Sequence, residues 1–151
     1  MQFQTHFIEI LLVEDNEGDV ELTREAFKES KVRNNIHVVN DGQAALDFIY
    51  RKPGYEDAVR PDVMLLDINL PRKDGKEVLK IVKNDPDLKH IPVVILTSSE
   101  AEKDIVKSYQ LHANCYIAKP VTLESFMEVI RSVEEFWLGV VKLPMISEKV
   151  S

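Results

Sequence analysis

Acidic, hydroxyl and lysine side chains stand where short apolar runs of the sequence end. Glu14 and Asp15 directly follow one run, and Asp67 directly follows another. Thr97 closes a further run, and Lys119 follows the last one. The carboxyl ends of parallel strands meet at one edge of a sheet, where α/β proteins bind their ligands. If the runs are such strands, three carboxylates, a hydroxyl and an ammonium group lie together.

This combination of side chains favours phosphoryl chemistry. Carboxylates that lie close together raise one another's pKa, and a hard cation such as Mg²⁺, bound by few protein oxygens, relieves that cost. A carboxylate can itself attack phosphorus and form an aspartyl phosphate. The transfer needs positive charge more than covalent help, which Mg²⁺ and Lys119 supply. The Thr97 hydroxyl can donate a hydrogen bond to a phosphoryl oxygen.

Each of these signals alone also has an ordinary structural explanation. Glu14 and Asp15 could simply favour the positive end of a following helix, and Thr97 could merely close a strand. Asp67 is more telling, because a carboxylate at the end of a strongly apolar run is costly to bury without a partner. Lys119-Pro120 suggests a turn that could hold a cis peptide bond. The functional interpretation rests on finding all of these groups at strand ends together.

The sequence supplies the elements that would position these groups. Five apolar runs are predicted strands, and several are continuously apolar, as expected of strands covered on both faces. Five amphipathic segments predict helices. The strands are 8–13, 36–39, 62–66, 92–96 and 114–118, and the helices are 17–30, a segment opened by Asp41-Gly42, a segment from Asp74-Gly75 to a stop at 84–86, 101–111 and 122–137. This alternation predicts an α/β fold with a parallel sheet and helices on both faces, and residues 51–60 are predicted to form a surface loop.

The strand-end motifs resemble the receiver domain of bacterial two-component response regulators. The motifs are Leu11-Leu12-Val13-Glu14-Asp15, Leu65-Leu66-Asp67-Ile68-Asn69-Leu70-Pro71, Asp74-Gly75, Leu96-Thr97-Ser98 and Tyr116-Ile117-Ala118-Lys119-Pro120. The resemblance covers residues 8–137. It implies a flavodoxin-like, doubly wound, five-stranded parallel sheet with strand order 2-1-3-4-5.

The resemblance also implies a role for each acidic residue. Asp67 would be the phosphoacceptor. Asp15, Asp67 and the backbone carbonyl of Asn69 would bind Mg²⁺, and Glu14 would complete the acidic pair indirectly or through a water molecule. The protein would catalyse only its own phosphorylation and dephosphorylation and would otherwise not be an enzyme.

The switch residues follow from the same resemblance. Lys119 would hold the phosphoryl group, and Thr97 would bond to it after transfer. The ring of Tyr116 would then turn inward and change the surface formed by the fourth helix, the fifth strand and the fifth helix. The alternative for Tyr116 is an amphipathic edge residue with its hydroxyl in water.

The partners are predicted from the same resemblance and from the two ends of the chain. The phosphodonor histidine is expected on a sensor histidine kinase, since His6, His37, His90 and His112 show no ligand spacing. Residues 1–7 form an N-terminal extension. The residues after 137 leave no room for an output domain, which predicts a stand-alone regulator. The apolar tail 138–151 either folds back on its own core or forms part of a homodimer contact, together with the surface of the fourth helix, the fifth strand and the fifth helix. We favour the dimer. The tail and the 51–60 loop are similar to single-domain regulators partnered with phytochrome-type kinases.

Composition excludes several other classes. The net charge of −7 and the pI of about 5.1 oppose a sequence-independent grip on nucleic acid. We find no apolar stretch of the roughly 20 residues that a bilayer requires and no signal peptide. The single Cys115 excludes an intramolecular disulfide and fits a reducing compartment, which predicts a cytoplasmic protein in which this thiol fills core space.

Three rival functions stay open on the sequence. An aspartate-nucleophile phosphohydrolase needs a second aspartate as general acid, where this chain has Asn69. An FMN-binding module needs a phosphate-binding loop where this chain has Glu14 and Asp15, which would repel a phosphate. A binding module that works without phosphorylation would not need Asp67, Thr97 and Lys119 together.

Overall fold

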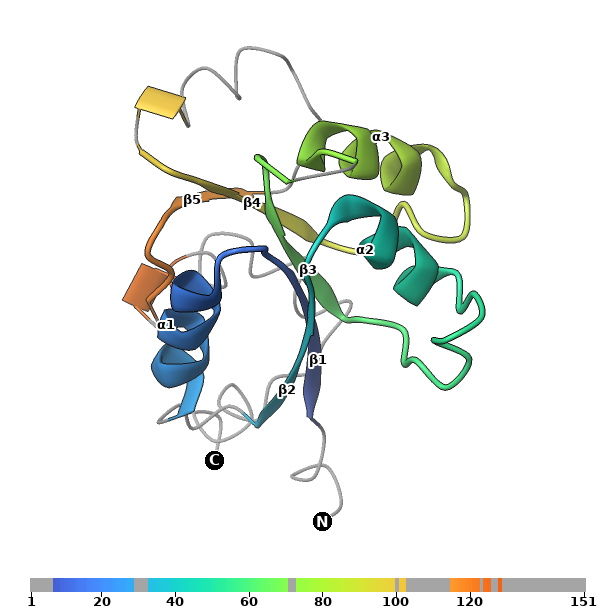
Figure 1. Ribbon diagram of the computed structural model, residues 1–151, viewed down its shortest axis with the longest axis horizontal. Coiled ribbons are helices and arrows are strands. Elements are labelled where there is room, and N and C mark those ends of the chain that lie inside the picture. Colours follow the sequence, from blue (N-terminus) through green and yellow to red (C-terminus); the bar gives the residue numbers. More distant parts are fainter. Residues whose placement is uncertain are drawn as a thin grey trace, which may run out of the picture.

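The structure is a computed structural model that describes residues 7–28, 33–70, 73–99, 101–102, 115–122, 124–125 and 128. Its strands and helices alternate along the chain (Figure 1). The strands are β1 (Ile8–Val13), β2 (Asn34–Val39), β3 (Val63–Asp67), β4 (Val93–Thr97) and β5 (Cys115–Ala118). The helices are α1 (Glu17–Lys28), α2 (Gly42–Ile49) and α3 (Gly75–Asn84).

The five strands form one parallel sheet in the order β2-β1-β3-β4-β5. This confirms the predicted fold class and strand order. Helix α1 lies on one face of the sheet, and α2 and α3 lie on the other (Figure 1). Because the strands are parallel, the loops that follow β1, β3, β4 and β5 all leave the sheet at the same edge.

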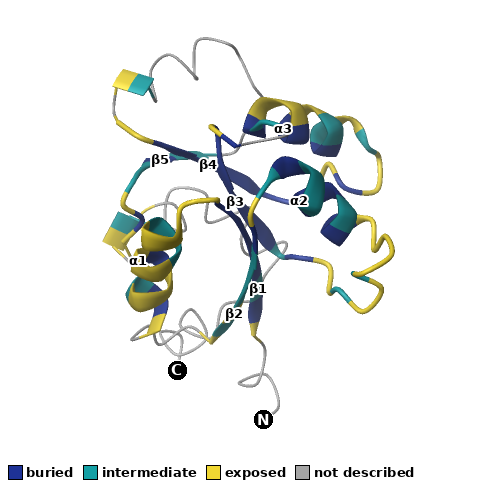
Figure 2. Cartoon of the chain, in the orientation of Figure 1, coloured by how far each residue is buried: buried dark blue, intermediate teal, exposed yellow. Residues whose placement is uncertain are grey.

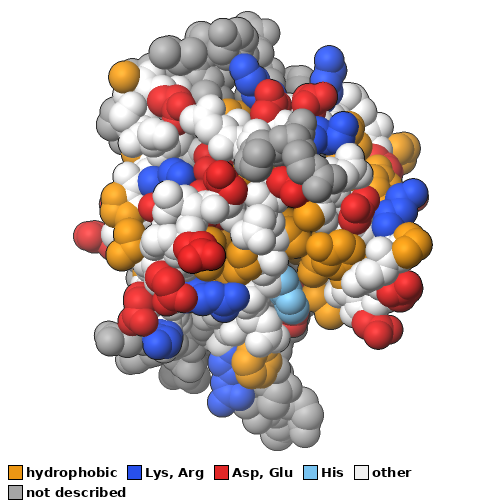
Figure 3. Space-filling model, viewed as in Figure 1, with side chains coloured by type: hydrophobic (Ala, Val, Ile, Leu, Met, Phe, Trp, Pro, Cys, Tyr) orange, Lys and Arg blue, Asp and Glu red, His pale blue; other side chains and the backbone are white. Residues whose placement is uncertain are grey.

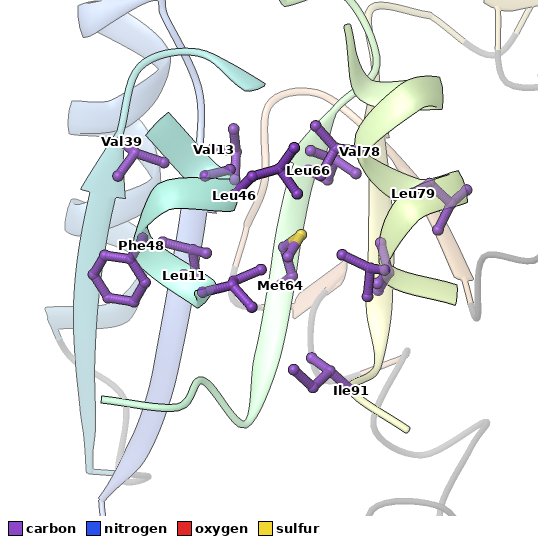
Figure 4. Packing of buried hydrophobic residues seen from close by; sticks show 14 of the residues in the cluster. Leu11, Val13, Val39, Leu46, Phe48, Met64, Leu66, Val78, Leu79 and Ile91 are labelled. Carbon is purple, nitrogen blue, oxygen red and sulfur yellow. The ribbon is translucent and has the colours of Figure 1, made fainter. Parts of the chain in front are cut away.

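Alternating side chains of the central strands contribute to two hydrophobic cores. The central strands are accordingly coloured as buried in Figure 2. The first core lies under α2 and α3 and contains Leu11, Val13, Met64, Leu66, Val93 and Ile95 (Figure 4). The second lies under α1 and contains Ile8, Ile10, Leu12, Val63, Leu65, Val94 and Leu96, with Phe27 from the helix. Every residue of β3 and β4 is buried. The continuous apolar runs therefore mark strands that are covered on both faces, as predicted.

β1 has the predicted bounds, whereas the bounds of the other four strands differ from the prediction by one or two residues. β2 begins at Asn34 rather than at residue 36, because Asn34 and Asn35 pair with Ile8 and Glu9 of β1. Their polar side chains hid this from the apolar pattern, although Asn35 donates a hydrogen bond to Glu9 Oε2 across the strands. β3 and β4 each extend one residue further and include Asp67 and Thr97. Both residues keep ladder partners in the neighbouring strand.

Most of the two last predicted helices and the whole tail lie outside the described residues. Of the segments 101–111 and 122–137, the structure describes only residues 101–102, 122, 124–125 and 128. Residues 138–151 and 1–6 are not described either. None of the described helices has the length and apolar character that a membrane crossing requires.

Helix α3 begins against the main chain of the strand that carries Asp67. The Asp74 side chain accepts a hydrogen bond from the Glu77 amide at 3.0 Å and caps the helix. At Gly75, a Cβ atom would lie 2.5 Å from the Asp67 carbonyl oxygen and 2.8 Å from the Ile68 Cα. Only glycine leaves room for this approach, so α3 holds the end of β3 directly.

Candidate functional site

An open hollow of about 530 Å³ lies at the carboxyl ends of the strands. Loops from four of the five strands and the start of α1 contribute to it. Its lining residues are Glu14, Asp15, Asn16, Asp19, Leu22, Asp67, Asn69, Ser98, Lys119 and Pro120. The sequence prediction that remote strand ends converge on one site therefore agrees with the fold.

Three carboxylates form a tight group in this hollow. Glu14 and Asp15 follow β1, and Asp67 ends β3. One carboxylate oxygen from each lies within 4.8 Å of the other two. Glu14 and Asp67 are buried, whereas Asp15 is exposed. Two of the three charges are thus largely removed from water.

The buried Glu14 carboxylate is difficult to ionise. Burial is the main cause, and the hydrogen bond and charge of Asp67 add to it, so that the pKa of Glu14 rises to about 7. The Asn16 amide, which donates to Glu14 Oε2 at 3.2 Å, and the Lys119 ammonium oppose the rise in part. Near neutral pH this site therefore carries an electrostatic cost that a cation would relieve.

This raised pKa predicts a fall in stability with rising pH when no divalent cation is present. Between pH 4.5 and about 7 the folded protein holds a proton on Glu14 that the unfolded chain releases. The contribution of Glu14 to the free energy of unfolding is therefore lost as the pH rises through this window. A shift of that size corresponds to roughly 3 kcal/mol. Urea denaturation in chelator at pH 5, 6, 7 and 8 should show the fall, and Glu14→Gln should flatten it. A wild-type curve that matches Glu14→Gln would contradict this reading of the site.

Lys119 carries the ammonium group at the centre of the hollow. It follows β5 and precedes Pro120 through a cis peptide bond, as the sequence had suggested. Its Nζ lies 3.2 Å from Asp67 Oδ2 and 3.2 Å from Glu14 Oε1. Burial alone would lower the pKa of Lys119, but the surrounding carboxylates outweigh it and raise that pKa above its ordinary value. The lysine is therefore charged throughout the physiological range.

Thr97 and Tyr116 lie on the β4 and β5 side of the site. Thr97 is fully buried, and its hydroxyl donates to the Ser99 carbonyl at 3.3 Å rather than lining the hollow. Tyr116 is half-buried and packs against the core under α2 and α3. Burial raises the pKa of its hydroxyl. The switch roles of these two residues stay predictions.

Asn69 joins two loops at the rim of the hollow. Its backbone N–H donates to Asp67 Oδ1 at 3.0 Å, and its side-chain Nδ2 donates to Glu102 Oε2 at 2.6 Å. Glu102 also accepts from the Ser98 amide, while its own amide donates to Ser99 Oγ at 3.2 Å. The loop that follows Asp67 is thereby tied to the loop that follows Thr97. The predicted metal contact of the Asn69 carbonyl stays a prediction.

Two acidic residues of this region were missed by the sequence reasoning. Glu102 sits three residues after Ser99, and this spacing is the sequence signature of a helix start in which the two residues cap each other. Asp19 lies in the first turn of α1, and its Oδ2 lies 3.0 Å from Lys119 Nζ. The available signal was an acidic residue one helical turn after Asp15. The same pattern is equally well explained by an acidic side chain that stabilises the N-terminal end of a helix.

The donor set fits a hard divalent cation. Three carboxylates that share one edge of the sheet, two of them buried, match the oxygen ligands and open coordination that Mg²⁺ prefers. Single basic side chains interrupt the acidic ones over the face seen in Figure 3, without a broad basic surface there. Two further sequence predictions concern Cys115 and the histidines. Cys115 is half-buried against the core under α1. His37 Nε2 lies 2.7 Å from Glu9 Oε1, away from the hollow.

Comparisons with known proteins agree with this fold and site. The model of the response regulator receiver domain matches residues 10–131. Response regulator Rcp1 of Synechocystis sp. (strain ATCC 27184 / PCC 6803 / Kazusa) is 46% identical over 135 residues, which are 89% of this chain and 92% of that protein.

Solved structures give the same result in three dimensions. The Mn²⁺-bound form of response regulator Rcp1 has a TM-score of 0.70 and 45% identity, and the match covers 91% of this chain and 99% of that chain. The phosphorylated cyanobacterial phytochrome response regulator RcpA has a TM-score of 0.72 and 46% identity, with 92% and 99% covered. The sheet order, the strand-end residues and these matches lead to one conclusion: the chain belongs to the response regulator receiver domain family of two-component systems.

Proposed function

We propose that the protein accepts one phosphoryl group on Asp67 and signals through the resulting change of its surface. The observation that carries this proposal is the position of the Asp67 carboxylate. It is buried at the end of β3, within 4.8 Å of two further carboxylate oxygens and 3.2 Å from the Lys119 ammonium. A buried carboxylate with a cation-binding group on one side and a lysine on the other is equipped for phosphoryl transfer.

The proposed transfer makes one bond and breaks one. An oxygen of the Asp67 carboxylate attacks phosphorus and forms an acyl phosphate. The bond from phosphorus to the donor breaks, and its electron pair leaves with the donor, a histidine imidazole of a kinase or the acetate of acetyl phosphate. Lys119 lies where it can bind an oxygen of the incoming group, because its Nζ already contacts Asp67 Oδ2.

Mg²⁺ is the cofactor that we propose for this step, held by Asp15, Asp67 and the backbone carbonyl of Asn69, with Glu14 in support. When bound, it would neutralise the negative charge that gathers between the carboxylates and the phosphoryl oxygens. The raised pKa of Glu14 supports this assignment, since it reflects a carboxylate that is buried and lies beside the charge of Asp67. A relative with a bound divalent ion, the Mn²⁺ form of Rcp1, is consistent with it.

The proposed signal begins at Thr97. Its hydroxyl would leave the Ser99 carbonyl, which it contacts at 3.3 Å, and donate to the phosphoryl group. Tyr116, which pairs with Ile95 of β4 and packs against the core under α2 and α3, would then turn inward. The predicted output surface includes β5 and the two helices that flank it, which lie largely outside the described residues. The predicted homodimer contact through this surface and the tail stays a prediction for the same reason.

Intact-mass analysis after incubation with acetyl phosphate tests the proposed function. With Mg²⁺, the wild-type protein should gain the mass of one phosphoryl group, and with excess chelator it should gain none. The same protein should not turn over small phosphate esters, because we propose no catalysis beyond its own phosphorylation and dephosphorylation. A folded wild type that gains no mass with Mg²⁺ would refute phosphoacceptor function and leave a binding module with this fold.

The proposed donor is a sensor histidine kinase of the phytochrome type. Support comes from the 46% identity to the cyanobacterial phytochrome response regulator RcpA over 92% of this chain. A phytochrome-type kinase that carries labelled phosphate should pass it to this protein at least tenfold faster than a kinase of another sensor class does. Equal transfer from both kinases would contradict the proposal of a phytochrome-type donor, but it would not contradict phosphoacceptor function at Asp67. A cytoplasmic location follows from such a donor and also stays a proposal.

A further inference from the structure

The side chain of Asp19 points into the site instead of capping its own helix. Asn16 directly precedes α1, and its Oδ1 accepts a hydrogen bond from the Asp19 amide at 2.9 Å. In a capping box, the acidic side chain three residues after the N-cap residue accepts a hydrogen bond from the backbone N–H of the N-cap residue. Here the Asn16 amide donates to Glu14 Oε2 instead. The Asp19 carboxylate is thereby left to contact Lys119.

The contact with Asp19 is the shortest that the lysine makes. Lys119 Nζ lies 3.0 Å from Asp19 Oδ2, against 3.2 Å from both Glu14 Oε1 and Asp67 Oδ2. An ammonium group has three N–H donors, and these three carboxylates from three different elements match that number. The lysine side chain is only 15% exposed, so few other positions are open to it.

Asp19 differs from the other two partners in its position relative to the cation site. Glu14 and Asp67 both belong to the group of three carboxylates that fits a divalent cation, and Asp19 does not. When a cation and then a phosphoryl group bind in the hollow, Glu14 and Asp67 would interact with them as well as with Lys119. Asp19 lies outside that group of carboxylates, so its oxygens would remain available to the lysine.

We propose that Asp19 is a positioning residue that holds the Lys119 ammonium beside Asp67 while the other carboxylates bind the cation and the phosphoryl group. This inference rests on the proposed phosphoacceptor function. Misplacement of a charged group by even about 1 Å costs rate steeply, so the contribution of Asp19 should appear in the rate of phosphorylation.

The kinetic test compares three variants at saturating Mg²⁺ and acetyl phosphate. Asp19→Asn keeps the shape of the side chain and removes its charge, and it should slow phosphorylation by about tenfold. Asp19→Glu keeps the carboxylate and should recover most of the rate. Glu17→Gln makes the same change of charge at an exposed acid in the same first turn of α1 and should match wild type. Asp19→Asn at the wild-type rate would overturn the proposal.

A spectroscopic readout separates positioning from a merely structural role. The ¹⁵N resonance of the Lys119 ammonium, assigned by Lys119→Arg, should be visible in wild type with Mg²⁺ because its protons are held by hydrogen bonds. It should broaden beyond detection in Asp19→Asn and persist in Glu17→Gln. Persistence in Asp19→Asn would overturn the proposal as well. Since this signal needs no phosphate, it tests Asp19 even if wild type takes up no phosphoryl group, the result that refutes the proposed function itself.

Discussion

Asp67→Asn is expected to abolish the Mg²⁺-dependent phosphate adduct completely. The amide cannot attack phosphorus as a carboxylate does, and the other two carboxylates of the site follow β1, whereas Asp67 ends β3. Intact-mass analysis under the conditions that modify wild type should show only the unmodified mass. The variant should also bind Mg²⁺ more weakly, because one of the three grouped carboxylates is gone.

The same variant is expected to fold at least as stably as wild type in chelator. Asp67 is one cause of the raised pKa of Glu14, so its neutralisation relieves repulsion and should raise the free energy of unfolding by about 1 kcal/mol at pH 8. Asp62→Asn is the matched control, since Asp62 precedes β3 at the opposite edge of the sheet, where its Oδ2 accepts from the Glu9 amide. That control should be modified like wild type. An adduct on Asp67→Asn would mean that another residue is the phosphoacceptor.

Lys119→Met is expected to lower both the phosphorylation rate and the stability of the cation-free protein. Loss of the ammonium removes a preorganised charge from the transferring group, and rates fall by about a hundredfold when such a donor is removed. It also leaves Glu14 and Asp67 buried together with no counter-charge, which should cost about 2 kcal/mol at pH 8 in chelator. The cost should shrink at pH 6, where Glu14 holds a proton, and shrink again with Mg²⁺. Urea denaturation at both pH values, with and without Mg²⁺, measures this loss of stability and its dependence on pH and on the cation.

Lys83→Met provides the control for this stability effect. Lys83 is a half-buried lysine in α3, and its Nζ donates to the Lys89 and Ile91 carbonyls at 3.0 and 2.8 Å. Its replacement should destabilise the protein to an extent that does not depend on Mg²⁺, because Lys83 does not line the hollow that holds the grouped carboxylates. If the loss in Lys119→Met were equally insensitive to Mg²⁺ and to pH, the electrostatic account of the hollow would be wrong.

The sequence was sufficient for the sheet and the described helices because burial on both faces leaves a strong pattern. β3 and β4 are continuously apolar and fully buried, and Asp41 and Asp74 mark helix starts by the cap each provides. The start of β2 was missed because it pairs through polar residues. Asn34 and Asn35 are held by the β1 ladder and by Glu9 rather than by burial, and no hydrophobic pattern records such pairing.

The site was predictable where its residues end strands and unpredictable where they reach it from helices. The topology brings Glu14, Asp67 and Lys119 together, so recognising the strands was enough to group them. Asp19 reaches Lys119 only because the Asn16 amide is occupied by Glu14. That outcome depends on which acceptor the Asn16 amide takes, which residue types and spacing do not specify.

The most direct test of the central claim is chemical mapping of the modified residue. Wild type treated with acetyl phosphate and Mg²⁺ is reduced with borohydride, which converts an aspartyl phosphate to homoserine, and the modified position is read by tandem mass spectrometry of its peptides. The account predicts homoserine at position 67 alone, in the Mg²⁺ sample and not in the chelator sample. Homoserine at position 15, at any other aspartate, or at none in a protein that has gained a phosphoryl group would contradict it.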